Sequence, residues 1–240
     1  MDDLSRKPLG IKAYGSIPHL PGSRRGPGDK GLSKEQASIC LEKLRDKYDT
    51  VIVQEKLDGS NCAVAKINGL IVPLVRSGYI ASSSPHKQHH YFACWVRKNE
   101  KRFCALLDEG ERCIGEWLSQ AHSTRYELPH EPFVIFDIMT KYKRINFDEL
   151  QKKCYDFIIP RLIHYGEPIS IESVLDILEP SGHGAIDPVE GAVWRVERKG
   201  NVDFLAKYVR HDKIDGAYFP QYTGNPIVWN WKPKKECAYG

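Results

Sequence analysis

Lys56 begins the short run Lys56-Leu57-Asp58-Gly59, directly after a segment that is typical of a β-strand, residues 50–55. An amine attacks phosphorus only in its neutral form, whereas a free lysine has a pKa near ~10.4. Burial and cationic neighbours lower the cost of that neutral form. Asp58 lies on the same side of an extended chain as Lys56, and Gly59 lets the backbone pass close to a ligand. The run therefore indicates a nucleophilic lysine, although Asp-Gly is also a common hairpin turn.

Other polar residues follow strand-like segments or turns in the same way. They comprise the acids Glu116, Asp137 and Glu190 and the cations Arg76, Arg195, Lys207 and Arg210. Acids suit a ribose hydroxyl or a divalent metal ion, and cations suit phosphates. Phe136 could stack on a base, and Asp137 could equally be a turn residue at a strand end. If one cleft collects them, they suit attack by lysine on the α-phosphate of a nucleotide beside a metal ion.

The elements that must position these residues are mostly strands. Alternating or continuous apolar runs predict strands at residues 50–55, 62–67, 70–75, 111–118, 132–139, 190–197 and 202–209. Asn68-Gly69 predicts a hairpin turn between two of them. Helices are expected at residues 33–48, 86–107 (one or two helices), 146–162 and 170–178. We therefore expect an α+β fold of mainly antiparallel sheets, flanked by helices, around a cleft.

Both ends of the chain and one internal link have an irregular composition. Residues 1–32 are rich in Gly and Pro and form either a disordered leader or an ordered loop over a site. Residues 179–187 suggest a flexible link. Residues 217–240 are aromatic and then basic. Such a tail can stack bases and hold phosphates, or it can pack back on the core.

The composition bounds the class of protein. The 240 residues suit one domain, or one with a small appendage, and the net charge of +4 is compatible with nucleic acid without arguing for it. No segment suggests a membrane partner. The seven scattered cysteines form no Cys-x-x-Cys pair, so we expect free thiols in a reducing, cytoplasmic setting. His86, His89 and His90 could be read as a metal cluster, but a polar helix start is favoured because no carboxylate or cysteine completes a ligand set nearby.

Six segments occur in a characteristic order. They are Lys56-Leu57-Asp58-Gly59, Arg76-Ser77-Gly78, Gly115-Glu116-Trp117-Leu118, Phe136-Asp137, Glu190-Gly191-Ala192-Val193 and Ala206-Lys207-Tyr208-Val209-Arg210. This series resembles the motif set of the covalent nucleotidyltransferases, which include DNA ligases, RNA ligases and mRNA-capping enzymes. Asn61 and the Lys-Tyr-Val-Arg ending are most similar to ATP-dependent RNA ligases of the double-strand-sealing and RNA-editing type.

The resemblance implies a nucleotidyltransferase (ATP-grasp-like) fold and a ligase that uses ATP with Mg²⁺ or Mn²⁺. Lys56 would take AMP as a phosphoramidate, AMP would pass to an RNA 5′-phosphate, and a 3′-hydroxyl would displace it. Lys56 and Lys207 would be catalytic, Glu190 and Asp137 would hold metal, and Arg195 and Arg210 would contact RNA. The nucleotide-binding set would be Glu55, Lys56, Asp58, Gly59, Asn61, Arg76, Glu116, Phe136, Glu190 and Lys207.

The sequence also departs from the pattern. Asp58 stands where some of these RNA ligases have histidine, and Leu205 and Val209 flank Lys207 where a second lysine is usual. Only about 30 residues follow Lys207, so we expect a single adenylyltransferase domain over residues 1–240 without a C-terminal OB domain. It would be a minimal ligase, or would need a partner to hold its substrate. DNA nick sealing, GTP-dependent capping and an inactive RNA-binding module stay open as alternatives.

Overall fold

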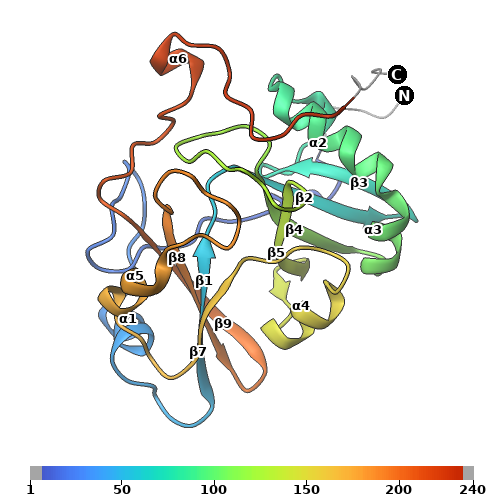
Figure 1. The fold of residues 1–240 in the computed structure, drawn as a ribbon. Coiled ribbons are helices and arrows are strands. Elements are labelled where there is room, and N and C mark those ends of the chain that lie inside the picture. Colours follow the sequence, from blue (N-terminus) through green and yellow to red (C-terminus); the bar gives the residue numbers. More distant parts are fainter. Residues whose placement is uncertain (1–6, 235–240) are drawn as a thin grey trace.

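Two antiparallel sheets form the centre of the computed structural model, which describes residues 7–234 (Figure 1). The first sheet has the strand order β7 (Leu162–Gly166), β1 (Asp49–Lys56), β8 (Gly191–Arg198) and β9 (Asn201–Val209). The second has the order β3 (Leu70–Val75), β2 (Ser60–Ile67), β4 (Glu111–Trp117), β5 (Phe133–Thr140) and β6 (Lys143–Arg144). The expected α+β fold with mainly antiparallel sheets is confirmed.

The chain crosses from the first sheet to the second at residues 57–59, immediately after Lys56. β1 ends there, and β2 begins opposite β4, with Ser60 paired to Trp117 and Asn61 to Glu116. A Cβ atom on Gly59 would lie 2.6 Å from the backbone oxygen of Trp117. Glycine is therefore needed for the close approach of this crossover to β4.

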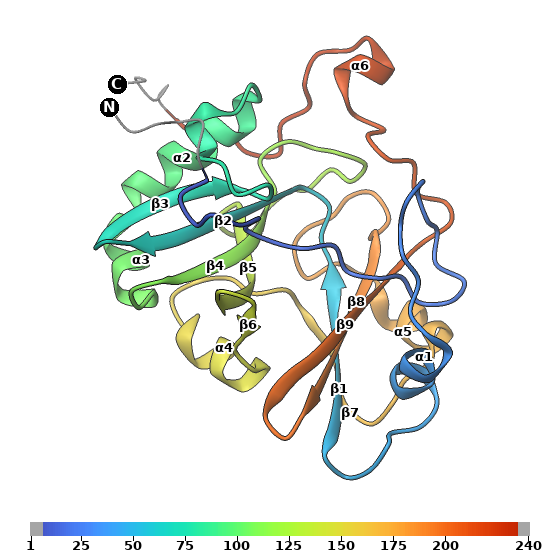
Figure 2. The same ribbon diagram turned by 180° about the vertical axis from the view of Figure 1, so that it is seen from behind.

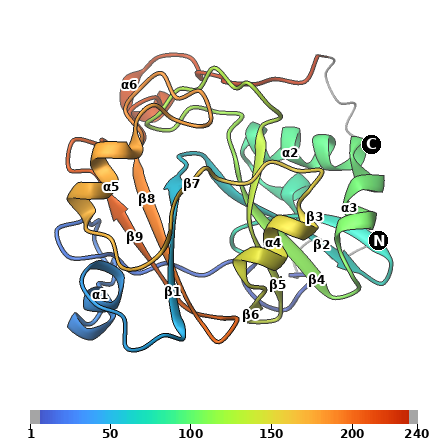
Figure 3. The same ribbon diagram turned by 60° about the horizontal axis from the view of Figure 1, so that its bottom comes forward.

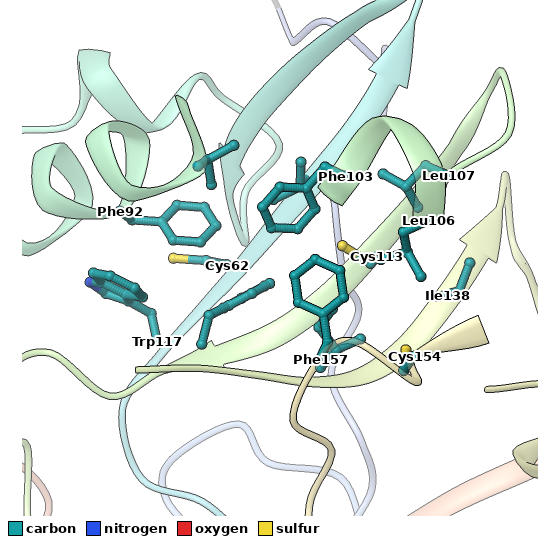
Figure 4. Close-up of a cluster of buried hydrophobic side chains, with 14 of the residues drawn as sticks. Cys62, Phe92, Phe103, Leu106, Leu107, Cys113, Trp117, Ile138, Cys154 and Phe157 are labelled. Carbon is teal, nitrogen blue, oxygen red and sulfur yellow. The ribbon is translucent and has the colours of Figure 1, made fainter. Parts of the chain in front are cut away.

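Helices cover each sheet on opposite flanks of the molecule (Figure 3). α1 (Lys34–Leu41) and α5 (Ile171–Leu178) lie beside the first sheet, where Val51, Trp194 and Leu178 are buried. α2 (Lys87–Lys98) and α3 (Glu100–Leu106) lie beside the second sheet. The core between these helices and the second sheet is largely aromatic. It includes Phe92, Phe103, Trp117 and Phe157 (Figure 4), together with Phe133. The remaining helices are η1 (Ala81–Ser83), α4 (Phe147–Lys153) and α6 (Pro220–Thr223).

Several predicted elements are confirmed. Asn68 (φ 51°) and Gly69 (φ 76°) form the turn between β2 and β3, both in the left-handed region that Asn-Gly favours. Ser33 accepts a hydrogen bond from the Gln36 backbone N–H as a helix cap, and Ser170 caps α5. The segment 86–107 is two helices, which meet at Asn99.

Two helix predictions are wrong in extent. The first helix ends at Leu41 rather than at residue 48. The segment 146–162 holds only the seven-residue α4, and Leu162 begins β7, which pairs with β1. Pro160 cannot continue a helix, and pairing to β1 favours an extended chain after it.

Parts of both terminal segments pack on the core, although residues 221–227 are exposed. In Figure 2 the N-terminal segment crosses from the second sheet to the first, and Ala13, Tyr14 and Leu20 are buried in it. In the C-terminal tail, Trp229 and Trp231 pack on the core of the second sheet. For these two residues, packing on the core is therefore favoured over stacking on bases. Residues 1–6 and 235–240 of the two predicted terminal segments lie outside the described residues.

The predicted flexible link at residues 179–187 is an ordered loop. Ser181 Oγ and the Gly182 backbone N–H donate to the Glu55 carboxylate at 2.5 and 2.8 Å. Cys40, Cys62, Cys104, Cys113 and Cys154 are free thiols, as expected. Cys94 is disulfide-bonded, which corrects that expectation for one residue. None of the helices within residues 7–234 has the length and apolar character to span a membrane.

Candidate active site

A cleft of about 970 Å³ lies between the two sheets, and residues from both sheets line it. The first sheet contributes Lys56 and Lys207, and the second contributes Glu116 and Phe136. Glu55, Gly59, Asn61, Arg76, Asp137 and Arg195 line the cleft as well. The structure thus brings most of the predicted nucleotide-binding residues into one cavity.

Lys56, which lines this cleft, forms an ion pair with Glu190, which is not itself among the lining residues. Its Nζ lies 2.6 Å from Glu190 Oε2, and the side chains are 21% and 12% exposed. Burial lowers the pKa of Lys56, but the carboxylates of Glu190, Glu116 and Asp58 outweigh it and leave that pKa above its ordinary value. Without nucleotide, the amine is therefore charged and not yet a nucleophile.

Glu116 is a carboxyl group whose environment favours the protonated form. Burial, together with the nearby carboxylates of Glu190 and Asp58, raises its pKa to about 8 despite the charge of Lys56. Its Oε1 accepts a hydrogen bond from the Gly59 backbone N–H at 3.1 Å. Glu116 is thus fixed next to the lysine, where a ribose hydroxyl would find a hydrogen-bonding partner.

Asn61 lines the same cleft from β2. Its Oδ1 atom is buried and has no hydrogen-bond partner within residues 7–234. A buried amide oxygen without a donor is costly, and such groups call for an explanation. A ligand in the cleft would supply the missing donor.

Asp58 is turned toward a neighbouring loop. One carboxylate oxygen accepts from the Ser123 backbone N–H at 2.7 Å and from the Ser123 hydroxyl at 2.6 Å. The backbone N–H of Asp58 donates to the Tyr126 hydroxyl at 3.0 Å. Asp58 is therefore a fixed charge close to Lys56 and is held by the loop 119–126.

Lys207 lies across the cleft on β9. Burial and the charge of Lys56 lower the pKa of Lys207. The family motif usually has a second lysine two residues from this one. Here those positions hold Leu205 and Val209, which are both buried. Arg210 does not line the cleft, and its guanidinium donates to Asp212 at 3.0 and 3.1 Å.

Asp137 and Arg195 pair with each other and are almost fully buried. Arg195 donates to Asp137 Oδ1 at 2.5 Å, while Arg144 and the Tyr14 hydroxyl donate to Oδ2 at 2.9 and 2.7 Å. A metal ion at Asp137 would have to displace an arginine, and RNA would not reach Arg195, which is 3% exposed. The predicted metal role of Asp137 and RNA role of Arg195 therefore do not fit this geometry.

The metal cluster weighed for His86, His89 and His90 is not formed. His89 bonds Ser60 Oγ at 2.7 Å through Nε2 and Ser84 Oγ at 2.6 Å through Nδ1. In the described part of the chain, no group of three or more His, Cys, Asp or Glu residues is suited to hold a metal ion. The metal role predicted for Glu190, which pairs with Lys56, stays a prediction.

Some residues around the site carried no sequence signal. Lys12, Tyr14 and Ser16 line the cleft from the N-terminal segment, and His122 lines it from the loop after β4. Lys213 is buried and donates to Thr124 Oγ1 at 2.6 Å, beside the Ser123 that holds Asp58. All of these lie in irregular segments, where periodicity says nothing about side-chain direction.

Comparison with known proteins places this site in a family. The family model for RNA ligases matches residues 49–209, and no curated protein matches the sequence. The Naegleria gruberi RNA ligase solved with PPi aligns with a TM-score of 0.55 and 18% identity, over 88% of this chain and 64% of that one.

A variant of the same ligase, solved with ATP and Mn, aligns with a TM-score of 0.52 and 16% identity, over 83% of this chain and 61% of that one. At these identities the likeness shows the shared nucleotidyltransferase fold. The chain spans less than two thirds of the length of those solved ligases. Because the family model covers more than half of the sequence, from β1 to the end of β9, this chain belongs to the RNA ligase family of the covalent nucleotidyltransferases.

Proposed function

We propose that this chain is an ATP-dependent RNA ligase that joins 5′-phosphate and 3′-hydroxyl ends through a lysyl-AMP intermediate. The observation that carries the proposal is the position of Lys56. Its amine lies in the cleft between the sheets, 2.6 Å from Glu190 and beside Glu116. A lysine so placed can be freed as a nucleophile when its carboxylate partner is engaged elsewhere.

In the first step the neutral Lys56 amine attacks the α-phosphorus of ATP. A P–N bond forms, the nitrogen loses a proton, the bond from that phosphorus to the bridging oxygen breaks, and pyrophosphate leaves. An oxygen of the RNA 5′-phosphate then attacks the same phosphorus, and the P–N bond breaks as the nitrogen gains a proton, which restores the Lys56 amine. Finally the 3′-hydroxyl oxygen attacks the RNA 5′-phosphorus, its proton is lost, and AMP leaves.

Other cleft residues would bind and orient the nucleotide. Phe136 and Val193 come from different sheets and line the cleft, where they could enclose the adenine ring. Arg76 and Lys207 would bind phosphate oxygens. Glu116 would accept from a ribose hydroxyl when ionised or donate when protonated.

Glu190 would hold the divalent metal ion, Mg²⁺ or Mn²⁺. Mg²⁺ is usually bound by one or two carboxylates together with substrate phosphates rather than by a complete protein cage. The arrangement here fits that habit, with Glu190 2.6 Å from the cleft residue Lys56 and no larger ligand cluster among the described residues. A cation bound there would neutralise phosphate charge and compete with Lys56 for Glu190, which would lower the pKa of the lysine.

The family match favours RNA over DNA as the strand that is joined. The similar RNA ligase that was solved with ATP and Mn supports ATP as the proposed donor. The substrate would be a nicked or broken RNA with a 5′-phosphate and a 3′-hydroxyl. A protein partner that supplies part of the RNA-binding surface is a further element of this proposal.

The test is a label-transfer assay with the purified chain, α-labelled ATP or GTP, and Mg²⁺ or Mn²⁺. A labelled band that depends on ATP and is absent in Lys56→Ala is expected. The same reactions with a nicked RNA and a nicked DNA should seal the RNA. Labelling by GTP alone would support capping instead, and RNA binding by folded protein with no label would support an inactive binding module.

A further inference from the structure

The N-terminal segment of residues 12–24, here called the arm, contacts three separate parts of the nucleotide cleft. The arm lies outside the region matched by the RNA ligase family, which begins at residue 49. It forms no helix or strand of its own. Even so, Ala13, Tyr14, His19 and Leu20 are all less than 5% exposed, so the arm is firmly docked.

The first contact fixes Arg76. The guanidinium Nη2 of Arg76 donates to the backbone oxygen of Gly15 at 3.2 Å and to Ser16 Oγ at 3.0 Å. The backbone N–H groups of Ala13 and Tyr14 both donate to the Arg76 backbone oxygen, at 3.1 and 3.3 Å. Arg76 is exposed and has several rotatable bonds, so these contacts determine which way its charge points.

The second contact supports Phe136. The Tyr14 ring meets the Phe136 ring edge to face, with centroids 5.3 Å apart. The Tyr14 hydroxyl donates to Asp137 at 2.7 Å, which anchors the ring from its far side. An aromatic pair of this geometry holds Phe136 at a fixed angle to the cleft.

The third contact aligns Lys207. The Lys207 backbone N–H donates to Pro18 O at 2.9 Å, and the Leu20 backbone N–H donates to Lys207 O at 2.9 Å. The arm thus runs beside the edge of β9 as an additional extended segment and continues to Arg24, whose N–H donates to Val209 O. Figure 2 shows this blue segment passing from one sheet to the other.

We infer that the arm is an integral part of the nucleotide site, with Ser16 and Tyr14 as positioning residues for Arg76 and Phe136. This inference rests on the proposed function, because it assigns ATP to the cleft. The same residues line the cavity, so the arm also forms one of its walls. Without these contacts, the Arg76 side chain would lose conformational entropy when ATP binds, and the affinity for ATP would be lower.

The test is a double-mutant cycle on Ser16 and Arg76, measured as the apparent KM for ATP in the label-transfer assay. Ser16→Ala should raise that KM by about threefold to tenfold, in keeping with one lost hydrogen bond to a charged group. In the Arg76→Ala background the same substitution should have no further effect, because Ser16 acts through Arg76. Ser16→Thr keeps the hydroxyl and should restore the wild-type KM.

Tyr14 and a matched control complete the design. Tyr14→Phe removes only the bond to Asp137 and should raise the KM less than Tyr14→Ala, which also removes the ring from Phe136. Ser33→Ala also removes one hydrogen bond that a serine hydroxyl accepts, here from the Gln36 backbone N–H at the start of α1, and it should leave the KM unchanged.

The inference would be overturned if Ser16→Ala changed the KM for ATP equally with and without Arg76, or changed it in neither background. If the wild-type chain is still labelled in that case, the proposed function stays intact. Absence of any label on the folded wild-type chain would instead reject the proposed function, and the inference with it.

Discussion

Lys56 and Glu190 illustrate how one pair of residues serves both the resting protein and the proposed reaction. At 2.6 Å the two charges satisfy each other in a partly buried place, where a lone ammonium or carboxylate would be costly. The same pairing keeps the amine protonated and raises its pKa. Chemistry at Lys56 therefore requires the pair to be loosened, and this links nucleophile activation to the binding of metal and nucleotide.

We predict that the single-turnover rate of AMP transfer to Lys56 rises with pH. Because the pKa of Lys56 is raised, the neutral amine is the minor form at neutral pH, and its fraction grows about tenfold per pH unit below that pKa. The rate should follow this slope from pH 6 upward and level off only above the pKa of the ATP-bound state. Rapid-quench labelling at saturating ATP and Mg²⁺ measures it.

Glu116 is the control for that profile, because the pKa of its carboxyl is raised to about 8 and it titrates in the same range. Glu116→Gln cannot titrate and should label more slowly while keeping the slope that belongs to Lys56. A flat profile in both proteins would mean that Lys56 is already neutral in the ATP complex.

At the scale of elements, the turn Arg76-Ser77-Gly78 follows β3 and packs against the start of the N-terminal arm. Gly78 has φ 93°, and a Cβ atom there would lie 2.2 Å from the backbone oxygen of Ile11. Ile11 directly precedes the arm, and the backbone nitrogen of Ala13 in the arm would lie 3.3 Å from the same Cβ atom. Only glycine allows the chain to approach this turn so closely at the start of the arm, since any side chain would meet both strain and a clash. The glycine of the motif thus serves the arm as well as the turn.

We predict that Gly78→Ala destabilises the protein by roughly 3–4 kcal/mol, since it adds a backbone clash to the strain of positive φ. Gly69→Ala is the matched control, because Gly69 has φ 76° but open space where the Cβ atom would lie. It should cost only about 1–2 kcal/mol. Urea unfolding monitors both, and Gly78→Ala alone should raise the KM for ATP. Equal losses would show that the arm does not need this approach.

The elements differ in how well sequence predicts them, for physical reasons. β2, β3 and their Asn68-Gly69 turn follow from local preferences that agree with one another, and so does the Ser170 cap. The sequence does not predict β7, because residues 162–166 become a strand only through pairing to β1, which is distant in sequence. Ordered motifs on strands predict the site residues Lys56, Glu116, Phe136 and Lys207. Tyr14 and Ser16 cannot be predicted in this way, because they lie in an irregular arm without periodicity.

At the scale of the whole molecule, the cleft belongs to neither sheet alone. β1, β8 and β9 supply Lys56, Val193 and Lys207, β4 and β5 supply Glu116 and Phe136, and the arm spans both sheets. The crossover at residues 57–59 is the covalent link nearest to the site. A bound nucleotide would therefore contact both sheets at once and resist their separation.

We therefore predict that ATP with Mg²⁺ raises the melting temperature of the whole chain. Lys56→Met is the protein to use, because it removes the nucleophile and leaves only reversible binding. ATP at about a hundred times its Kd stabilises a folded protein by ~2.7 kcal/mol, which corresponds to about 5–10 °C for a chain of this size.

GTP at the same concentration is the control and should give a smaller shift, since the proposed donor is ATP. Adding Phe136→Ala to Lys56→Met should reduce the shift produced by ATP, because the ring that would stack on adenine is lost. An equal shift in melting temperature with ATP and GTP would mean that Phe136 and Val193 do not distinguish the two bases. No shift with either would mean that the cleft between the sheets does not hold a nucleotide.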